Sequence, residues 1–306
     1  MYTDLYNNQY TREALAFSSN RRFTVIALIR DICIGIGARV IPLEQVVDCF
    51  NKLHSAASIL DDLADNETIR AGKPTFHIRH SSVIAAITSV HLLLDGIQDC
   101  LSFGLDHEQA FHHLLNIARA EEADIGMIGR DTSHTYLQWY INVTARKTSH
   151  EFLLLLDILS QGVARSRAKE LEVLRDVINE YGLLLQLAND WRDWFVNDPL
   201  YRVGKDENFV LTNSLAIAMQ CERGEIKLAN EIGRSFHINE IRPMLAETIG
   251  EANKSACSAL ISGRIEYLQS MLASSNADYL QSLANIIDEQ QLNQFWNDNN
   301  VNKYVK

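Results

Sequence analysis

The chain has 306 residues, of which 47% are apolar and 22% are charged. This composition is typical of a globular protein with a sizeable core, and it excludes a long disordered or low-complexity chain. The 28 Lys and Arg residues are outnumbered by 39 Asp and Glu residues, and the formal net charge of −11 argues against nucleic acid or an anionic membrane surface as a partner.

The cysteines and the N-terminus indicate the compartment. The five cysteines are widely spaced and form no C-x-x-C pair, so we expect reduced, mostly buried thiols. Residues 1–9 lack the basic and apolar segments of a signal peptide, and no apolar run reaches the roughly 18 residues that span a bilayer. The sequence therefore predicts a soluble cytoplasmic protein without a transmembrane segment.

Apolar residues recur at intervals of three and four along most of the chain, which is the period of a helix. Helices are expected over residues 23–36, 43–60, 82–94, 107–125, 137–159 and 168–195. Alternating strand patterns are missing, and residues 152–159 are apolar on nearly all sides, as in a helix surrounded by other helices. The prediction is an all-α fold: a single large helical bundle over residues 1–306, with a polar tail after about residue 296.

Three aspartates, Asp61, Asp62 and Asp65, directly follow the helix expected over residues 43–60. If the helix continues, the carboxylates of Asp61 and Asp65 lie on one face because they are four residues apart. Like charges at this spacing weaken a helix by roughly a few tenths of a kcal/mol. A solvated helix end is one interpretation. A Mg²⁺ site is the other, because hard cations bind carboxylate oxygens and keep waters that a phosphate can replace.

The residues after this cluster favour the metal site. Arg70 lies within reach of an anion that the metals would hold, and Gly72 and Pro74 break the helix. Residues 61–77 read D-D-L-A-D-N-E-T-I-R-A-G-K-P-T-F-H. This resembles the first aspartate-rich motif of the trans-isoprenyl diphosphate synthase (polyprenyl synthetase) family, D-D-x-x-D-x-x-x-x-R-R-G-x-P-T-x-H, except that Ala71 replaces the second arginine.

Three later segments match the same family in order. Residues 181–193 read Y-G-L-L-L-Q-L-A-N-D-W-R-D, similar to the second motif F-G-x-x-F-Q-x-x-D-D-x-x-D, with Asn189 in place of the first aspartate. Lys147 and Thr148 match a K-T pair whose lysine binds the allylic diphosphate, and Lys205 lies in a segment similar to G-K-x-x-D. Taken singly, a polar helix stripe or a surface lysine would account for each match. The ordered set, over about residues 12 to 220, favours the family.

The resemblance implies a bundle of the isoprenoid synthase type with a central active-site cavity. Its chemistry would be the Mg²⁺-dependent ionisation of an allylic prenyl diphosphate, such as farnesyl or geranylgeranyl diphosphate, to a carbocation. Two or three Mg²⁺ ions are expected. The expected metal ligands are Asp61, Asp62, Asp65, Asn189, Asp190 and Asp193. Two acidic groups on facing helices would both project into the core of such a bundle.

The resemblance also implies roles for other residues. The diphosphate would be bound by Arg70, Lys147, Lys205 and Gln186, and the catalytic residues would be Asp61, Asp65, Arg70, Lys147 and Asp190. Ala56 and Ala57, just before the first motif, are small and would line the pocket for the hydrocarbon chain. A homodimer is expected as well.

The site for a second substrate departs from the family pattern. Members that elongate a chain hold isopentenyl diphosphate with an N-terminal G-G-K-R-x-R-P segment, a His or Gln seven residues before the first motif, and the second arginine after it. Here residues 18–24 read S-S-N-R-R-F-T, so Arg21, Arg22 and His54 are what remains of this pocket. Losing two or three charge-assisted contacts of roughly 1.5–3 kcal/mol each would weaken binding about a thousandfold or more.

The sequence therefore favours a terpene synthase, which converts the carbocation by cyclisation, elimination or water capture. A prenyltransferase, which would elongate with isopentenyl diphosphate or alkylate another acceptor, is the alternative. A non-catalytic regulatory subunit of a prenyl synthase is a third interpretation, because Asn189 replaces one of the six motif aspartates.

Overall fold

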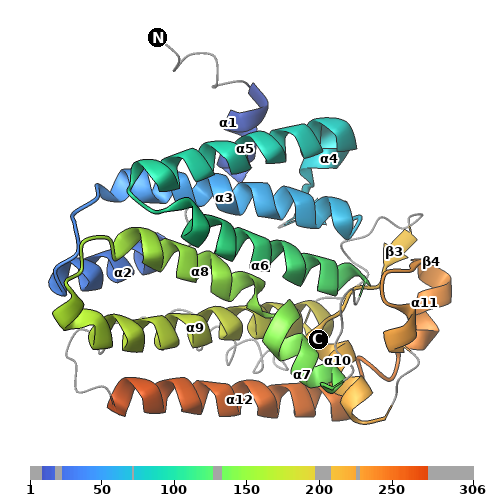
Figure 1. Cartoon of the computed structure of the whole chain (residues 1–306). Helices are drawn as coiled ribbons and strands as arrows, with labels where there is room; N and C mark the ends of the chain where they lie inside the picture. The colour runs from blue at the N-terminus through green and yellow to red at the C-terminus, as the bar shows by residue number, and fades with distance from the viewer. Residues whose placement is uncertain are drawn as a thin grey trace, which may run out of the picture.

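The computed structural model describes residues 9–17, 23–70, 72–126, 133–196, 208–224 and 228–274. Most of these residues are helical, as Figure 1 shows, and the predicted all-α fold is confirmed. The α-helices are α1 (Gln9–Phe17), α2 (Phe23–Gly35), α3 (Leu43–Ala64), α4 (Phe76–Arg79), α5 (Ser82–Ser102), α6 (His107–Gly126), α7 (Tyr136–Trp139), α8 (Arg146–Leu159), α9 (Ala168–Phe195), α10 (Leu215–Glu222), α11 (Ile238–Leu245) and α12 (Glu251–Ser274).

Short elements connect some of these helices. A π-helical turn, η1, spans Tyr140–Thr144, and 3-10 turns span η2 (Arg165–Arg167) and η3 (Leu228–Glu231). Two antiparallel sheets of two strands each pair β1 (Ile69–Arg70) with β2 (Lys73–Pro74), and β3 (Asn208–Val210) with β4 (Ser235–His237). The sequence did not predict these strands, because two or three residues are too few to show an alternating pattern.

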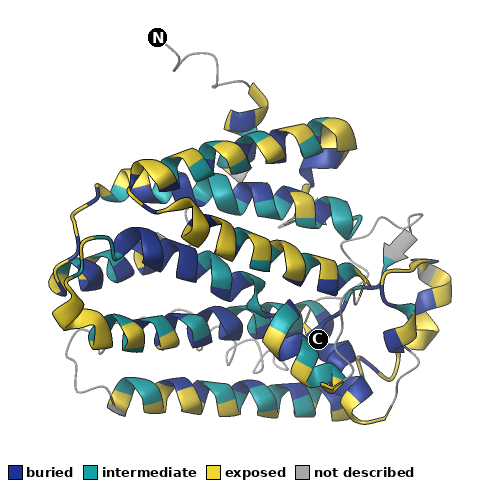
Figure 2. Ribbon diagram, in the orientation of Figure 1, coloured by how far each residue is buried: buried dark blue, intermediate teal, exposed yellow. Residues whose placement is uncertain are grey.

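The long helices are stacked in layers. In Figure 1, α3 lies beside α5, and the α6 and α8 pair separates them from α9 and α12. Close packing joins α3 to α5, α6 to α8, α8 to α9, and α9 to α12. Helix α8 is at the centre, and every residue from Phe152 to Leu159 is buried (Figure 2), as the apolar run predicted. This stack places the ends of α3, α6, α8 and α9 around one space.

Helix α3 continues past the expected end. Its apolar residues Val46, Phe50 and Ile59 are buried, and the helix runs on to Ala64, so that Asp61 and Asp62 are helical and Asp65 is the C-cap. The chain then forms β1 and β2, with Gly72 between them in the left-handed backbone region at φ +76°. A glycine adopts this φ at little cost, which permits the tight reversal from β1 to β2.

The expected continuous helix over residues 137–159 is wrong in detail. Helix α7 ends at Trp139, the π turn η1 follows, and α8 begins at Arg146. A π turn holds more residues than an α turn, so it shifts the face that later residues present, and such turns are frequent at functional sites. Tyr140, the first residue of the turn, is fully buried. Apolar spacing does not reveal the change because one turn is too short to break the pattern.

Within the described ranges, α5 alone has the length and apolar composition to cross a membrane, with a mean hydropathy of 1.3, and 39% of that window is buried. The same test is passed by core helices of proteins that never enter a membrane, so this is weak evidence for a span. The cytoplasmic location stays a prediction. The polar tail after residue 296 lies outside the described residues, and the single-domain organisation also stays a prediction.

Candidate active site

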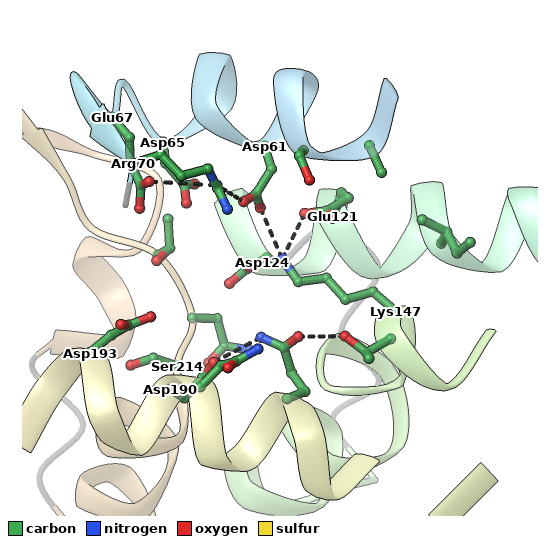
Figure 3. A pocket seen from close by; sticks show the side chains of 18 of the residues that line it. Asp61, Asp65, Glu67, Arg70, Glu121, Asp124, Lys147, Asp190, Asp193 and Ser214 are labelled. Carbon is green, nitrogen blue, oxygen red and sulfur yellow. Dashed lines mark hydrogen bonds and ion pairs between the residues drawn. The ribbon is translucent and has the colours of Figure 1, made fainter. Parts of the chain in front are cut away.

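A polar cavity of about 250 Å³ lies where the ends of α3, α6, α8 and α9 meet (Figure 3). Among the residues that the structure describes, eight carboxylic acids line it, against three Lys or Arg residues. The acids are Asp61, Asp65, Glu67, Glu121, Asp124, Glu151, Asp190 and Asp193, and the cations are Arg70, Lys147 and Arg192. An excess of buried or half-buried acids over cations is costly unless further positive charge is bound.

The end of α3 provides one wall of this cavity. Asp61 and Asp65, one helical turn apart, both line it, whereas Asp62 does not. The Asp62 side chain is buried and accepts a hydrogen bond from Nε of Arg70. Asp62 thus contacts Arg70 and is not among the residues that line the cavity. Its role as a metal ligand stays a prediction. Arg70 also donates from Nη2 to Oδ2 of Asp61, at 2.6 Å.

Lys147, on the first turn of α8, joins α3 to α6. Its Nζ lies 3.1 Å from Oδ1 of Asp61, 3.0 Å from Oε2 of Glu121 and 3.0 Å from Oδ2 of Asp124. Sequence reasoning missed Glu121 and Asp124. The available signal was three acids, with Glu122, in four consecutive residues of an amphipathic helix. Their spacing of three puts Glu121 and Asp124 on one face of α6.

Helix α9 provides the opposite wall. In Figure 3, Asp190 and Asp193 face Asp61 and Asp65 across Lys147. Asp190 is fixed by three donors: the hydroxyl of Tyr140, the backbone N–H of Leu215 at 2.9 Å, and Nε2 of Gln186 at 2.8 Å. Asn189 lines the cavity too, and its Oδ1 accepts a hydrogen bond from Arg192 at 2.9 Å. The predicted groups from the two motifs thus share one cavity.

Thr148 links α8 to the Asp190 network. Its hydroxyl donates to Oε1 of Gln186 at 2.8 Å, which orients the Gln186 amide so that Nε2 faces Asp190. Gln186 was expected to bind the diphosphate directly. It lines the cavity, and both of its amide ends are also hydrogen-bonded to protein.

The electrostatics of the cavity favour a bound cation. Burial raises the pKa of Asp65 well above its usual value, and the charges of Asp61 and Asp124 act in the same direction. Burial likewise raises the pKa of Glu121 to about 8 and that of Asp124 to about 6, although the charge of Lys147 opposes both shifts. Additional positive charge in the cavity would favour the ionised form of each of these carboxylates.

The donor set fits a hard metal ion. Carboxylate oxygens of Asp61, Glu121 and Asp124 lie within 4.8 Å of one another. Oxygen ligands of this kind suit Mg²⁺, which is usually held by one or two carboxylates together with waters and substrate phosphates. The same cluster also contacts Lys147, so a protein cation neutralises part of its charge.

An apolar cavity of about 380 Å³ adjoins the polar one. It lies between α3, α5, α6 and α8, and its wall includes Ala56 and Ala57, the residues expected to line a chain pocket. Ala57, His54 and Asp61 line both cavities, so the two meet along one face of α3. Volumes of this order match small-molecule sites. The pair of cavities suits a molecule with an anionic head and an apolar tail.

Three predicted site residues, Arg21, Arg22 and Lys205, lie outside the described residues, as does Ala71. Of the residues predicted for the second-substrate pocket, His54 is the one that the described part of the chain places at the site. His54 is half-buried, and its Nδ1 lies 3.2 Å from Oε1 of Glu151.

Comparisons with known proteins agree with this fold. The chain is 25% identical over 166 residues to geranylfarnesyl diphosphate synthase of Aeropyrum pernix, covering 50% of this chain and 49% of that protein. It is 20% identical over 151 residues to phomopsene synthase of Phomopsis amygdali, covering 49% of this chain and 20% of that protein. The chain thus spans about half the length of the first of these relatives and a fifth of the second.

A solved structure and a family model extend the comparison. Decaprenyl diphosphate synthase from Rhodobacter capsulatus has a TM-score of 0.68 at 16% identity, covering 91% of this chain and 87% of that chain, which shows a shared fold. The family model described as polyprenyl synthetase matches residues 12–247, well over half of the chain. Motifs, fold and family match agree, and the chain belongs to the polyprenyl synthetase family of enzymes.

Proposed function

We propose that this protein ionises an allylic prenyl diphosphate to a carbocation in a Mg²⁺-dependent reaction. The observation that carries the proposal is the junction of two cavities: a polar one with acids from α3 and α9 beside Arg70 and Lys147, and an apolar one next to it. The first suits the diphosphate and its metals, and the second suits the hydrocarbon chain.

Asp61 and Asp65 on α3, and Asp190 with Asn189 and Asp193 on α9, would hold the metal ions. When bound, Mg²⁺ neutralises the negative charge that develops on the departing diphosphate. Family members in general require Mg²⁺, and we propose that two or three ions bind at this site.

The protein's own residues would act on the diphosphate and on the chain. Arg70 and Lys147 border the cavity and both contact Asp61, so both would donate hydrogen bonds to diphosphate oxygens. Lys205, outside the described residues, is proposed for the same role by resemblance alone. Tyr140 and Gln186 keep Asp190 oriented. The apolar wall excludes water from the allylic carbon, which protects the cation.

Two fates of the carbocation are proposed. A terpene synthase, acting without a second substrate, is supported by the substitutions at residues 20, 23 and 71, where family members that elongate carry Lys or Arg. A prenyltransferase is supported by the relatives, because the protein from Aeropyrum pernix is named for the synthesis of a prenyl diphosphate. The distinction depends on whether isopentenyl diphosphate is consumed.

Purified protein would be incubated with Mg²⁺ and with geranyl, farnesyl or geranylgeranyl diphosphate, each with and without isopentenyl diphosphate. Released diphosphate and organic products would be measured separately, the latter by gas chromatography. Hydrocarbon or alcohol formed from an allylic substrate alone supports a terpene synthase. Strict dependence on isopentenyl diphosphate supports elongation. An absence of diphosphate release under all conditions contradicts both and supports a regulatory subunit.

The matched variants are Asp61→Asn and Asp190→Asn, with Asp176→Asn as control. Asp176 is an exposed residue on α9, the same helix as Asp190. We expect either site variant to lower diphosphate release by about a hundredfold or more, because removing one group that stabilises developing charge has effects of this size. Equal activity of all three variants would contradict the placement of the site.

A homodimer is proposed as well. Apolar residues on the outer face of α5 form a stripe with spacings of four, three and four: Val83, Ile87, Val90 and Leu94, which are 68%, 66%, 51% and 61% exposed. Phe111 and Leu115 on α6 are 48% and 54% exposed. A continuous exposed apolar stripe is typical of an interface, and a second copy of this chain is the partner that the family resemblance supports.

A further inference from the structure

An acidic side chain lies in the wall of the apolar cavity. Glu151 of α8 lines this cavity together with Leu154, Leu155 and Ile158 of the same helix, and its side chain is only 15% exposed. Its Oε1 lies 3.2 Å from Nδ1 of His54 on α3. A half-buried carboxylate among leucines is costly unless it has a partner, so the contact with His54 is central to its placement.

The pair lies at the junction of the two cavities. His54 and Glu151 are both among the residues that line each cavity. His54 is seven residues before Asp61 on α3, and Glu151 is four residues after Lys147 on α8, so each shares a helix face with a residue of the ion cluster. At 1.5 Å per residue these offsets are roughly 10 Å and 6 Å. The pair is therefore displaced from the diphosphate end towards the hydrocarbon chain.

Because of the contact with Glu151, the two ring nitrogens of His54 have different roles. With Glu151 ionised, Nδ1–H of His54 donates to the carboxylate, and Nε2 keeps its lone pair. The imidazole plane is also aligned with the Phe50 ring, with 15° between the planes and 6.0 Å between centroids. This is the arrangement of an oriented general base with a carboxylate that stabilises the protonated ring.

We propose that His54 and Glu151 form a proton-accepting dyad that ends the carbocation reaction. This inference rests on the proposed function in its terpene synthase form, because elimination ends with the loss of a proton, whereas in elongation His54 belongs to the pocket for isopentenyl diphosphate. His54 is the catalytic residue, and Glu151 positions it.

The step is balanced as follows. Ionisation leaves the C–O bonding pair on the diphosphate and an empty orbital on carbon. A C–H bond next to the cationic carbon then breaks, its electron pair forms the new C=C bond, and the proton goes to Nε2 of His54. The imidazolium is stabilised by Glu151 and later returns the proton to water.

The other acids of the apolar cavity are poorer candidates. Asp61 and Glu121 are both held by Nζ of Lys147, and Glu122 is exposed. His54 is the residue whose base nitrogen remains available while its ring is fixed by a carboxylate.

The test compares Glu151→Gln, Glu151→Asp and His54→Gly with the exposed controls Glu108→Gln and His107→Gln at the start of α6. Diphosphate release is measured separately from products, and products are divided into those formed by proton loss and prenyl alcohols formed by water capture. In His54→Gly we expect the ratio of proton-loss product to alcohol to fall at least about tenfold, and added imidazole to restore it. Glu151→Gln should lower the same ratio of proton-loss product to alcohol. Glu151→Asp keeps a carboxylate, so its ratio should stay closer to that of the wild type.

The outcomes separate this inference from the function on which it rests. If His54→Gly and the nearly isosteric Glu151→Gln both release diphosphate and keep the wild-type product ratio, the dyad is overturned, and another base such as the released diphosphate takes the proton. If the wild-type protein releases no diphosphate from any allylic substrate, the proposed function is overturned together with the dyad. If His54→Gly does not fold, the product ratio of Glu151→Gln alone decides whether the dyad is supported or overturned.

Discussion

At the scale of single residues, Lys147 contacts three carboxylates, from Asp61, Glu121 and Asp124. Its side chain is 14% exposed, so these are not solvent-screened surface pairs. Removing one partner of such a cluster leaves uncompensated buried charge, which typically costs about 3–5 kcal/mol.

The first prediction concerns this cluster. Lys147→Met should lower the free energy of unfolding by about 3 kcal/mol in the absence of divalent cations. Mg²⁺ should recover more stability in this variant than in the wild type, because a ligand that binds the folded state stabilises it by mass action. Melting temperatures with and without Mg²⁺ measure both effects. Lys169→Met, an exposed residue of α9, is the control. An equal response of the two variants to Mg²⁺ would contradict a metal site here.

The second prediction concerns the chain pocket. Ala57 lines both cavities, so Ala57→Phe places a ring in the apolar cavity of about 380 Å³. We expect kcat/KM for geranylgeranyl diphosphate to fall by about tenfold relative to geranyl diphosphate, since the cost of overpacking, about 1–3 kcal/mol, applies only to the longer chain. Ala168→Phe, at the exposed start of α9, should leave the ratio unchanged. A parallel loss for both substrates would argue against this pocket.

At the scale of elements, the α8 and α9 pair fixes the distance between Thr148 and Gln186. A Cβ on Gly182 would lie 2.5 Å from Cα and 2.8 Å from N of Ser149, both backbone atoms that cannot move without shifting α8. The glycine is therefore required by the close approach of two helices that carry site residues.

The third prediction follows from this contact. Gly182→Ala should destabilise the protein by about 1–3 kcal/mol through overpacking and should also reduce diphosphate release, because α8 and α9 would separate. Gly263→Ala on α12 has nothing within 4 Å of the added Cβ. It should be neutral or stabilising by up to about 1 kcal/mol, because alanine favours a helix. Urea denaturation followed by circular dichroism measures both. Similar curves for the two variants would contradict the argument.

A histidine pair joins α6 to α8. Nδ1 of His113 lies 3.1 Å from Nδ1 of His150, and Nε2 of His113 lies 2.8 Å from Oδ2 of Asp157. Burial lowers the pKa of His150 from 6.5 to about 4, and positive charge on His113 acts in the same direction. The folded state therefore favours the neutral form of His150.

The fourth prediction is the resulting pH dependence. Between about pH 6.5 and about pH 4, the unfolded chain binds a proton at His150 that the folded chain does not, so stability is lost as the pH falls through this window. Because the ring is only half-buried, we expect the titration of His150 to lower the free energy of unfolding by about 1–2 kcal/mol across this window. Urea denaturation across the window should show a smaller loss in His150→Gln. An identical pH profile for the variant would assign the loss to other groups.

At the scale of the whole molecule, the apolar stripe on α5 lies on the outside of the stack, where Figure 2 shows exposed residues alternating with intermediate and buried ones. The fifth prediction is that Ile87→Glu combined with Leu94→Glu converts a dimer into a monomer, because two buried charges would oppose association. Light scattering after size-exclusion chromatography measures the mass. Val40→Glu, 62% exposed outside the stripe, is the control. A wild-type protein that is monomeric would contradict the interface.

The sequence by itself determined the all-α fold class, most of the long helices up to residue 195, and the family. Helical period, helix-breaking Gly72 and Pro74, and the spacing of Asp61 and Asp65 are local properties that can be read from the chain. The family match and the shared fold confirm the family and the helical fold.

Only the tertiary structure decided which side chains face the cavity. Glu121, Asp124 and Glu151 enter the site because α6 and α8, which pack on each other, border the same two cavities as α3, an arrangement of segments far apart in sequence that no local spacing encodes. Asp62 is held by Arg70, which the chain brings back to the end of α3. The π turn before α8 is likewise not visible in the apolar period, because one turn is too short to break the pattern.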